Sequence, residues 1–480
     1  MPPARLQPFI RGAFAPSAGD GTLPDLNPSD PDDVVALVPS GSPDDATGAV
    51  TAAAEAWAAW RTLPGPARAE HLYKWAEVVG SRREELAQAM AREVGKPIAE
   101  ARGEVGRGEM ILRYHAGEAV RNLGDVIPAQ APGALQLTLR EPLGVVACIT
   151  PWNFPFAIPL WKTAPALAFG NTVVLKPAED ASAMASLLAE TAAAAGLPAG
   201  VFNVVPGSGT TVGPALIAAE AVRAVSFTGS AAVGASVALT CARRNIRYQT
   251  EMGGKNVVIV AADADLDRAA TLTAAGAMRY AGQKCTATSR VVVVRSVAER
   301  FLAKLKEQVE ALPIGPVTDS KAAVGPLITA KARDRVRAAV TGAGAVVTGG
   351  REPADGRFQK GFFFAPTVIR DVPPDAPLAT EEVFGPVLAT FVADDLDHAI
   401  TLANRTRYGL SASLFTKDLG SALEYVRRIE AGVVRVNGDT TGVDPHAPFG
   451  GLKGSSSGSR EQGPAAREFY TEIKTVQVHP

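Results

Sequence analysis

The stretch TVVLKPAEDASAMASLLAETAAAAGLPAGVFNVV, residues 172–205, places an alanine-rich segment between two short runs rich in valine. Runs of β-branched residues favour strands, and the alanine-rich segment 181–195 favours a helix. The alternation extends outward to GVVACIT (144–150), AVSFTG (224–229) and NVVIV (256–260). Strand, helix and strand in this order predict parallel βαβ units in an α/β fold.

More than one domain is expected, because 480 residues exceed what a single hydrophobic core usually serves. A second strand–helix series begins near residue 290 with RVVVV and indicates a second α/β domain. Residues 47–123 have a helical pattern. Within it, SRREELAQAMAREVGKP (81–97) predicts a helix with a capping box of Ser81 and Glu84 and a stop at Gly95.

Two further strand patterns stand apart from both series. LQLTLRE (135–141) and the tail REFYTEIKTVQVHP (467–480) alternate like exposed strands, far apart in the sequence. Strands without an evident core of their own suggest a small sheet that pairs between subunits.

Composition excludes several classes of function. Forty-eight basic and forty-nine acidic side chains give a net charge of −1, which argues against nucleic acid as a partner. The N-terminus lacks an apolar signal-peptide core, and prolines with Lys162 interrupt the richest apolar segment, 148–170, so no membrane partner is expected. The three cysteines form no CxxC pair or Cys/His cluster, which argues against a disulfide framework and a metal site. We therefore expect a cytoplasmic protein with free thiols.

Three residues have the chemistry of a covalent catalyst. Cys285 lies among small and polar residues in YAGQKCTATSR (280–290), whereas Cys148 lies in a strand and is expected in the core. Asn153, in ITPWNFPF, could donate a hydrogen bond to an oxyanion, and Glu251, beside a glycine pair, could act as a base. Taken singly, Asn153 is more often a turn residue and Glu251 a surface carboxylate.

Other short motifs have the pattern of a dinucleotide site. Lys176 and Glu179 follow a strand in VVLKPAED and could grip a ribose, although a solvated loop pair is the alternative. In AVSFTGSAAVG, Gly229 makes a turn and Ser230 opens a helix whose N–H groups could face a pyrophosphate. GSGTTVG (207–213) is one residue longer than the usual fingerprint and is weak alone.

Seven motifs, in order, resemble the NAD(P)-dependent aldehyde dehydrogenase superfamily from about residue 20 to 478: TPWNFP, LKPAE, FTGS, EMGGK, GQKCTA, EEVFGPV and PFGGLKGS. The resemblance implies a Rossmann-type cofactor domain and a second α/β catalytic domain with a small β oligomerisation arm. The expected bounds are 1–123 and 143–252 for the cofactor domain, 253–455 for the catalytic domain, and 124–142 and 456–480 for the arm. A homodimer or homotetramer is then expected.

The same resemblance implies the roles of individual residues. Cys285 is the expected nucleophile, Asn153 the oxyanion donor and Glu251 the base that activates water, with no metal required. The residues implied in cofactor binding are Thr150, Trp152, Lys176, Glu179, Gly209, Gly213, Gly229, Ser230, Gly234 and Glu382. NAD is expected to be preferred, because the charge of Glu179 repels a 2′-phosphate, and NADP remains possible because Lys176 can pair with that phosphate.

For the substrate, GVDPHAPFGGLKGSSSGSREQG (442–463) looks especially like the α-ketoglutarate semialdehyde (2,5-dioxopentanoate) dehydrogenases. By family position, the substrate tunnel is lined by Phe154, Trp161, Lys284 and Phe449. A carboxylate on the aldehyde could pair with Lys284 or Lys162.

Three alternatives stay open. Lys284 could instead point to solvent in a dehydrogenase of neutral aliphatic or aromatic aldehydes. A CoA-acylating relative generally lacks the glutamate that Glu251 supplies, and a non-catalytic scaffold would be expected to lose Cys285 or Asn153.

Overall fold

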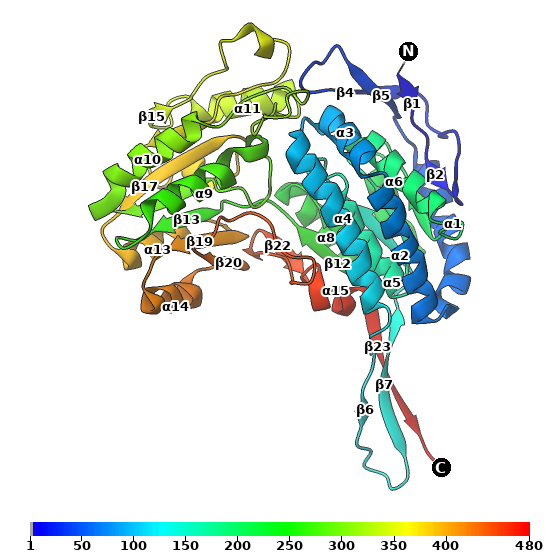
Figure 1. Ribbon diagram of the computed structural model, residues 1–480. Coiled ribbons are helices and arrows are strands. Elements are labelled where there is room, and N and C mark those ends of the chain that lie inside the picture. The colour runs from blue at the N-terminus through cyan, green and yellow to red at the C-terminus, as the bar shows by residue number, and fades with distance from the viewer. Residues whose placement is uncertain (1–2, 122) are drawn as a thin grey trace.

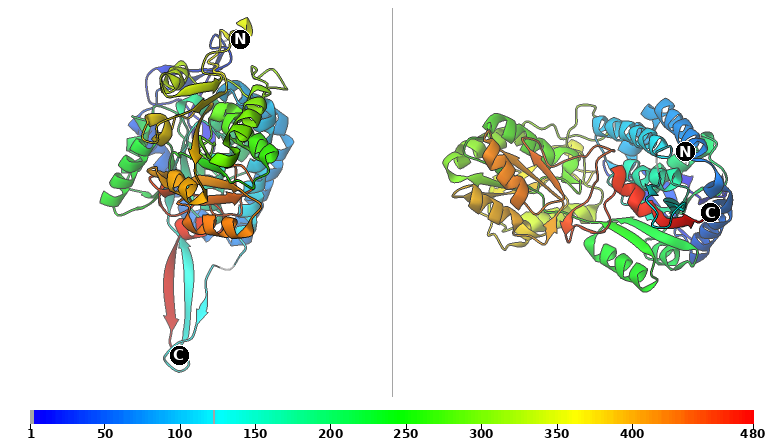
Figure 2. Two further views of the ribbon diagram at one scale, coloured as in Figure 1. Left: turned by 90° about the vertical axis from the view of Figure 1, so that its left-hand side faces the viewer. Right: turned by 90° about the horizontal axis from the view of Figure 1, so that it is seen from below.

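The computed structural model describes residues 3–121 and 123–480. Two α/β lobes lie side by side, and a narrow β arm projects from the lobe that contains the N-terminal half of the chain (Figures 1 and 2). One continuous core cluster contains buried residues of both lobes, such as Trp75 and Phe301. None of the helices in the described ranges is long and apolar enough to cross a membrane.

The first lobe is built on an eight-stranded sheet in the order β22-β12-β11-β8-β9-β10-β2-β3. Its strands are β2 (Phe9–Ile10), β3 (Ala13–Phe14), β8 (Val145–Ile149), β9 (Thr172–Lys176), β10 (Phe202–Val204), β11 (Val222–Thr228), β12 (Arg247–Glu251) and β22 (Ser456–Gly458). The βαβ prediction is confirmed, because β8, β9, β10, β11 and β12 pair in parallel with one another, whereas β2 and β22 join them antiparallel.

The chain reverses its direction across this sheet next to β8. It runs outward from β8 to β9 and β10, and then returns to place β11 on the other side of β8. Ligands of open α/β sheets bind at such a switch point, outside the carboxyl ends of the strands. The ends of β8 and β11 therefore mark the place to look for a ligand site.

Helices cover both faces of this sheet (Figure 1). They are α1 (Pro43–Thr62), α2 (Gly65–Ser81), α3 (Arg83–Val94), α4 (Ile98–Glu118), α5 (Ala157–Ala168), α6 (Ser182–Ala194), α7 (Val212–Ala218) and α8 (Ala231–Arg243). Every residue of α5 is buried, and α4 packs against it. This places α4 over the turn that precedes α5, where Asn153 lies.

The second lobe has a seven-stranded sheet in the order β15-β16-β17-β14-β13-β19-β20. Its strands are β13 (Val257–Val260), β14 (Arg290–Val294), β15 (Ala345–Thr348), β16 (Thr367–Arg370), β17 (Val387–Ala393), β19 (Ser411–Phe415) and β20 (Val433–Val436). Its helices are α9 (Leu266–Met278), α10 (Ala298–Glu310), α11 (Ala330–Val340), α12 (Pro377–Thr380), α13 (Leu396–Asn404) and α14 (Leu419–Arg428). Residues 252–256 connect β12 of the first sheet to β13 of the second.

Smaller elements complete the fold. A three-stranded sheet joins β1 (Ala4–Arg5), β5 (Val34–Pro39) and β4 (Thr22–Leu26), and β18 (Tyr408–Gly409) pairs with β21 (Leu452–Lys453). The arm contains β6 (Val126–Ile127), β7 (Leu135–Pro142) and β23 (Thr471–Val478), and α15 (Gly463–Tyr470) precedes β23.

The two lone strand patterns are partners within one chain. β7 and β23 pair antiparallel along their full length, from Leu135 opposite Val478 to Pro142 opposite Thr471. The predicted start of the C-terminal arm segment at residue 456 is too early. β22 pairs with β12 of the first sheet, and α15 buries Phe469 and packs near α5, because its apolar face needs a core.

The predicted capping box before α3 is wrong, although Gly95 does end this helix in a left-handed conformation with φ 68°. Ser81 is the last residue of α2, and its hydroxyl donates to the Val78 carbonyl. Because α2 continues into α3 through Arg82, the Ser81 side chain has no free helix start to cap. The Glu84 carboxylate pairs with Arg102 instead.

Candidate active site

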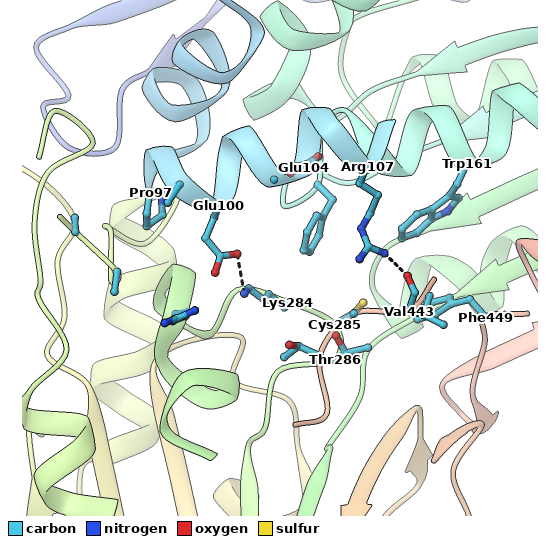
Figure 3. Close-up of a pocket in the computed structure, with 18 of the residues that line it drawn as sticks. Pro97, Glu100, Glu104, Arg107, Trp161, Lys284, Cys285, Thr286, Val443 and Phe449 are labelled. Atoms are coloured by element: carbon cyan, nitrogen blue, oxygen red, sulfur yellow. Dashed lines mark hydrogen bonds and ion pairs between the residues drawn. The ribbon is translucent and has the colours of Figure 1, made fainter. Parts of the chain in front are cut away.

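A cavity of about 570 Å³ lies between α4 and the loops that carry Cys285 and Phe449 (Figure 3). Phe154, Trp161 and Phe449 contribute aromatic walls, and the Trp161 and Phe449 ring centroids are 5.7 Å apart. Lys284 and Cys285 also line the cavity. The cavity thus contains all four residues that the sequence predicts in a substrate tunnel, together with the predicted nucleophile.

Cys285 is held by its backbone. It follows a tight turn in which Tyr280 and Ala281 both have positive φ, 56° and 50°, a conformation that non-glycine residues rarely adopt. The Asn256 side-chain amide donates to the carbonyls of Cys285 and Ala287, each at 2.8 Å. These bonds fix the backbone of Cys285 and of the two residues that follow it. Asn256 ends the motif YQTEMGGKN, but nothing in the sequence showed that its amide reaches Cys285.

The electrostatic surroundings of Cys285 oppose a thiolate. Burial raises the pKa of the Cys285 thiol to about 12, and the nearby carboxylates of Glu382 and Glu251 add to the increase. The backbone N–H of Thr286 acts in the opposite direction. At neutral pH the sulfur is therefore held as S–H until a proton acceptor or a positive charge reaches it.

Asn153 contacts the loop that carries this thiol. Two hydrogen bonds hold it, one made by its side chain and one by its backbone. Its side-chain Nδ2 donates to the Gln283 carbonyl at 3.1 Å, which leaves its second N–H bond available. Its own backbone carbonyl accepts a hydrogen bond from Lys96 Nζ at 2.7 Å. The amide is thus oriented toward the loop of Cys285 by one bond and held in place by another.

Lys96 forms a buried ion pair with Glu104 of α4, and both side chains are 1% exposed. The Lys96 ammonium also lies over the rings of Phe154 and Tyr280, 4.0 and 4.5 Å from their centroids. Glu104 Oε1 accepts from the backbone N–H groups of Phe156 and Ala157, each at 3.0 Å. One ion pair therefore connects α4, the Asn153 turn and the start of α5. The sequence showed only a helical pattern here, without a sign of this pairing.

Glu251 is the last residue of β12, and its buried side chain lies close enough to Cys285 to affect the pKa of the thiol. Its Oε2 accepts a hydrogen bond from the Ser456 hydroxyl at 2.6 Å, and its Oε1 has no hydrogen-bond partner within residues 3–121 and 123–480. Burial and the nearby Glu461 raise the pKa of Glu251 well above its ordinary value, and the Ser456 hydrogen bond lowers it. A raised pKa makes the carboxylate a stronger base, so its unpaired oxygen is suited to accept a proton.

The two lysines predicted as carboxylate partners are both already ion paired. Lys162 is fully buried and pairs with Glu461, and its Nζ also donates to the Ser226 hydroxyl at 2.9 Å. The structure does not bring Lys162 to the cavity, because its ammonium is buried in the pair with Glu461 and does not line the cavity. Lys284 lines the cavity, but its Nζ lies 2.9 Å from a carboxylate oxygen of Glu100.

Several residues predicted to bind a cofactor lie near the switch point of the first sheet. Glu179 Oε1 accepts from the Gly209 N–H at 2.7 Å, and Lys176 Nζ lies 3.7 Å from Glu179 Oε2. Ser230 is the N-cap residue of α8, and its side chain makes no capping bond. The Gly229 N–H donates to the Glu251 carbonyl at 3.0 Å, which connects this turn to the catalytic candidates.

Two buried hydroxyls at the carboxyl ends of β8 and β11 indicate whether a polar ligand fits there. Thr150 directly follows β8 and Thr228 ends β11, on the two sides of the switch point. Both hydroxyls are buried, and neither has a hydrogen-bond partner in the described part of the chain. Unsatisfied buried hydroxyls are costly, so their presence beside the uncapped α8 helix fits the binding of a polar, phosphate-bearing ligand.

The remaining predicted cofactor residues are more dispersed. Gly213 lies in α7 with open space beside it, whereas a Cβ at Gly234 would lie 2.5 Å from the sulfur of Met252, so Gly234 serves close packing. The Trp152 ring packs edge-on against Phe384 at 5.7 Å. Glu382 accepts from the Gly254 N–H at 3.1 Å, and burial raises its pKa to about 7.

Comparisons with known proteins identify relatives along the whole chain. The model of the Aldehyde dehydrogenase family matches residues 14–476. The alpha-ketoglutaric semialdehyde dehydrogenase of Bacillus subtilis (strain 168) is 45% identical over 476 residues, which are 98% of each chain. The succinate-semialdehyde dehydrogenase [NADP(+)] of Escherichia coli (strain K12) is 38% identical over 480 residues, 99% of this chain and 98% of that protein.

A solved structure agrees with these relatives in fold. The crystal structure of an NAD-dependent aldehyde dehydrogenase from Sinorhizobium meliloti has a TM-score of 0.95 and 39% sequence identity. The match covers 99% of this chain and 96% of that chain. Both lobes and the arm therefore have counterparts in a protein of this class.

The buried Lys96–Glu104 pair gives a stability prediction. Lys96→Met should lower the free energy of unfolding by about 3–5 kcal/mol, because it leaves the Glu104 carboxylate buried without a cation to balance its charge. Adding Glu104→Gln should recover part of the loss, because an amide carries no charge but still accepts from the start of α5. Urea denaturation of each variant measures this effect.

The control is Lys74→Met, because Lys74 and Glu70 form an exposed pair at 3.7 Å. It should change the free energy of unfolding by less than about 0.5 kcal/mol. Equal effects of Lys96→Met and Lys74→Met would contradict a structural role for the buried pair.

Proposed function

Because the chain belongs to the aldehyde dehydrogenase family and is an NAD(P)-dependent aldehyde dehydrogenase, we propose that it oxidises a small aldehyde that carries a carboxylate. The substrate type we propose is α-ketoglutarate semialdehyde. The similarity to the alpha-ketoglutaric semialdehyde dehydrogenase of Bacillus subtilis supports this choice. The distribution of charge around the cavity is the main structural support for this substrate class.

Cationic side chains are in excess around the cavity. Four of them line it, against two carboxylates: Arg107, Arg279, Lys284 and Lys321 against Glu100 and Glu104. Both carboxylates are already paired, Glu100 with Lys284 and Glu104 with Lys96. The other three cations, Arg107, Arg279 and Lys321, have no carboxylate within 4.0 Å in the described residues. A cavity with this balance attracts an anionic substrate and disfavours a cationic one.

Cys285 is the proposed nucleophile. The Cys285 thiol first gives its proton to solvent. The thiolate Sγ then attacks the aldehyde carbon, so that a C–S bond forms, the C=O π bond breaks and the carbonyl oxygen becomes an oxyanion. The Cys285 backbone N–H and the N–H bond of Asn153 that Gln283 leaves free would donate to this oxyanion. Collapse of the oxyanion expels a hydride and leaves the acyl group on sulfur as a thioester.

Glu251 is the proposed base for the second half of the reaction. Its unpaired Oε1 would take a proton from water, whose oxygen attacks the thioester carbon. The C–S bond then breaks, the acid is released, and the thiol of Cys285 is restored. This role requires the carboxylate form of Glu251.

The cofactor is proposed to bind along the switch point of the first sheet, and when bound its nicotinamide supplies the hydride acceptor. Lys176 and Glu179 would hold the adenosine ribose, Ser230 and the first turn of α8 the pyrophosphate, and Glu382 the nicotinamide ribose. NAD is the proposed preference, because the carboxylate of Glu179 would repel a 2′-phosphate. The adjacent Lys176 leaves NADP as the weaker alternative.

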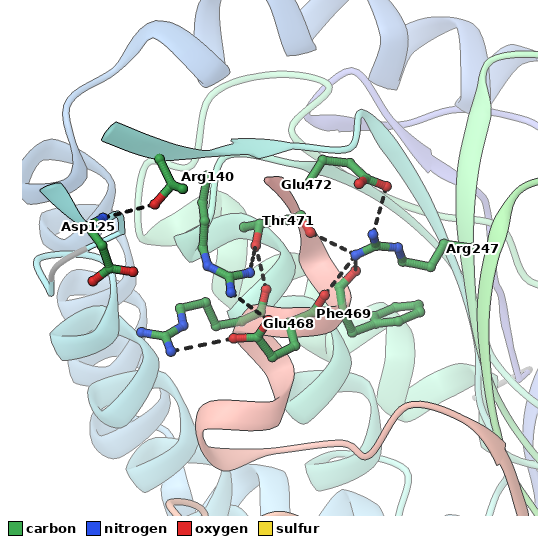
Figure 4. A network of polar contacts seen from close by, with 9 residues as sticks. Asp125, Arg140, Arg247, Glu468, Phe469, Thr471 and Glu472 are labelled. Atoms are coloured by element: carbon green, nitrogen blue, oxygen red, sulfur yellow. Dashed lines mark hydrogen bonds and ion pairs between the residues drawn. The ribbon is translucent and has the colours of Figure 1, made fainter. Parts of the chain in front are cut away.

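The arm is proposed to assemble a homodimer or homotetramer. It exposes five large apolar side chains: Val126, Leu135, Leu139, Ile473 and Val478. Its base is rigidly held, because Arg247 of β12 donates to the carbonyls of Glu468, Phe469 and Thr471 and pairs with Glu472 (Figure 4). Sedimentation equilibrium tests this: a monomer mass at micromolar concentration would contradict it.

Steady-state kinetics test the proposed substrate and cofactor together. The kcat/KM for α-ketoglutarate semialdehyde should exceed that for pentanal about tenfold or more, because one charged contact is worth about 1.5–3 kcal/mol. The ratio should fall as salt is added, since salt screens the attraction. NAD should give a higher kcat/KM than NADP. Equal values for both aldehydes would contradict the proposed substrate class.

The Ser456 hydroxyl gives a pH prediction for Glu251. The hydroxyl stabilises the carboxylate form, so Ser456→Ala raises the pKa of Glu251 further above its ordinary value. Only the carboxylate accepts the proton of water, so kcat falls as pH falls through this pKa. The acid limb of the kcat profile should therefore move to higher pH in Ser456→Ala.

Ser457→Ala is the matched control, because the Ser457 hydroxyl bonds to Thr250 at 2.8 Å instead. Its kcat profile should keep the acid limb of the unmodified enzyme. A limb that stays in place, or moves to lower pH, in Ser456→Ala would argue against Glu251 as the base.

A further inference from the structure

We propose that Arg107 of α4 binds the carboxylate at the far end of the substrate and so sets the selectivity for anionic aldehydes. This inference rests on the proposed function, which states the substrate class but not the residue that recognises it. The sequence pointed to Lys284 and Lys162 for this task, and both are committed to carboxylates of the protein itself.

Among the cations that line the cavity, Arg107 alone is both partly buried and free of a carboxylate within the described residues. Lys284 is paired with Glu100, whereas Arg279 and Lys321 are exposed, so water already solvates their charges. Burial lowers the pKa of Arg107, which shows that its charge is held in a poorly solvated place. An anion that reaches Arg107 would gain more than one that reaches an exposed cation.

The Arg107 guanidinium is held in one orientation but still has free N–H donors. It donates to the backbone carbonyl of Val443, on the loop across the cavity. A guanidinium has five N–H bonds in a rigid fork, so donors remain for a carboxylate, which such a fork binds with two parallel hydrogen bonds. In Figure 3 the Arg107 side chain descends from α4 beside Trp161 and reaches Val443 near Cys285.

The helix leaves room beside this group. Gly103 lies one turn before Arg107 on the same face of α4 and also lines the cavity. A Cβ built at Gly103 would meet nothing within 4 Å. Glycine weakens a helix interior, so its position here, next to an unpaired guanidinium, is consistent with space kept for a ligand.

The carboxylates near Arg107 do not neutralise it. Glu104 and Asp444 favour its charge from a distance, but Glu104 is committed to Lys96, and Asp444 is exposed. Arg435 acts against the charge. A substrate carboxylate would therefore complete the polar contacts of Arg107 without displacing an existing ion pair.

The test compares Arg107→Met with Arg279→Met, which removes an exposed cation from the same cavity. For each variant, kcat/KM is measured with α-ketoglutarate semialdehyde and with pentanal. Arg107→Met should lower kcat/KM for the charged aldehyde about ten- to a hundredfold and leave the value for pentanal within about threefold. Arg279→Met should lower the value for the charged aldehyde by less than about threefold. Arg107→Lys, which keeps the charge but loses the fork, should lie between Arg107→Met and the unmodified enzyme.

A binding readout separates recognition from a structural defect. Calorimetry with α-ketoglutarate, which keeps the carboxylate end and needs no turnover, should show weaker binding in Arg107→Met by a similar factor. A purely structural role would lower kcat/KM for both aldehydes equally, and that result would overturn the proposal. An unchanged ratio of the two values in Arg107→Met would overturn it as well.

Different measurements test the proposed substrate class and the role of Arg107. If the unmodified enzyme shows no preference for the charged aldehyde, the proposed function fails before any variant is made. If it shows the preference and Arg107→Met keeps it, the proposed function stands and only the role of Arg107 is lost.

Discussion

The buried ion pair of Lys96 and Glu104 is the interaction on which the geometry of the site most depends. Its ammonium holds the Asn153 carbonyl, and its carboxylate holds the first N–H groups of α5. Isolated charges of this kind are costly to bury, and each partner here has further hydrogen bonds that compensate the loss of water. The pair thereby sets the distance between α4, which carries Arg107, and the turn that carries Asn153.

Acidic side chains lie close to the thiol of Cys285. Glu251 and Glu382 are buried close enough to raise the pKa of Cys285, and Glu461 contributes less. Such surroundings keep the sulfur protonated and unreactive until a cation lies beside it. The oxidised nicotinamide ring carries a positive charge, so the same carboxylates that restrain the thiol suit the cofactor of this family. The cations around the cavity would attract the anionic substrate, and the carboxylates near the thiol would attract the oxidised nicotinamide.

Local patterns in the sequence predicted the elements but not their charge partners. The βαβ units and the Gly95 stop follow from the order of β-branched, alanine-rich and glycine residues, which act locally. The capping box failed because Ser81 lies inside a continuous path from α2 to α3. Arg107 stands in GEVGRGEM, which has the composition of a solvated helix face. Lys284 and Glu100, which pair at the cavity, lie 184 positions apart in the chain, so no local pattern shows that this charge is already paired.

The central claim is that the oxidation proceeds through a thioester on Cys285, and intact-protein mass spectrometry tests it most directly. Glu251→Gln enzyme would be mixed with oxidised cofactor and α-ketoglutarate semialdehyde, quenched in acid within one turnover, and digested for peptide mapping. The account predicts one added acyl group, on the peptide that contains Cys285, because acylation proceeds while hydrolysis lacks its base. Reduced cofactor formed without any adduct, or an adduct on Cys148 or Cys241, would contradict it.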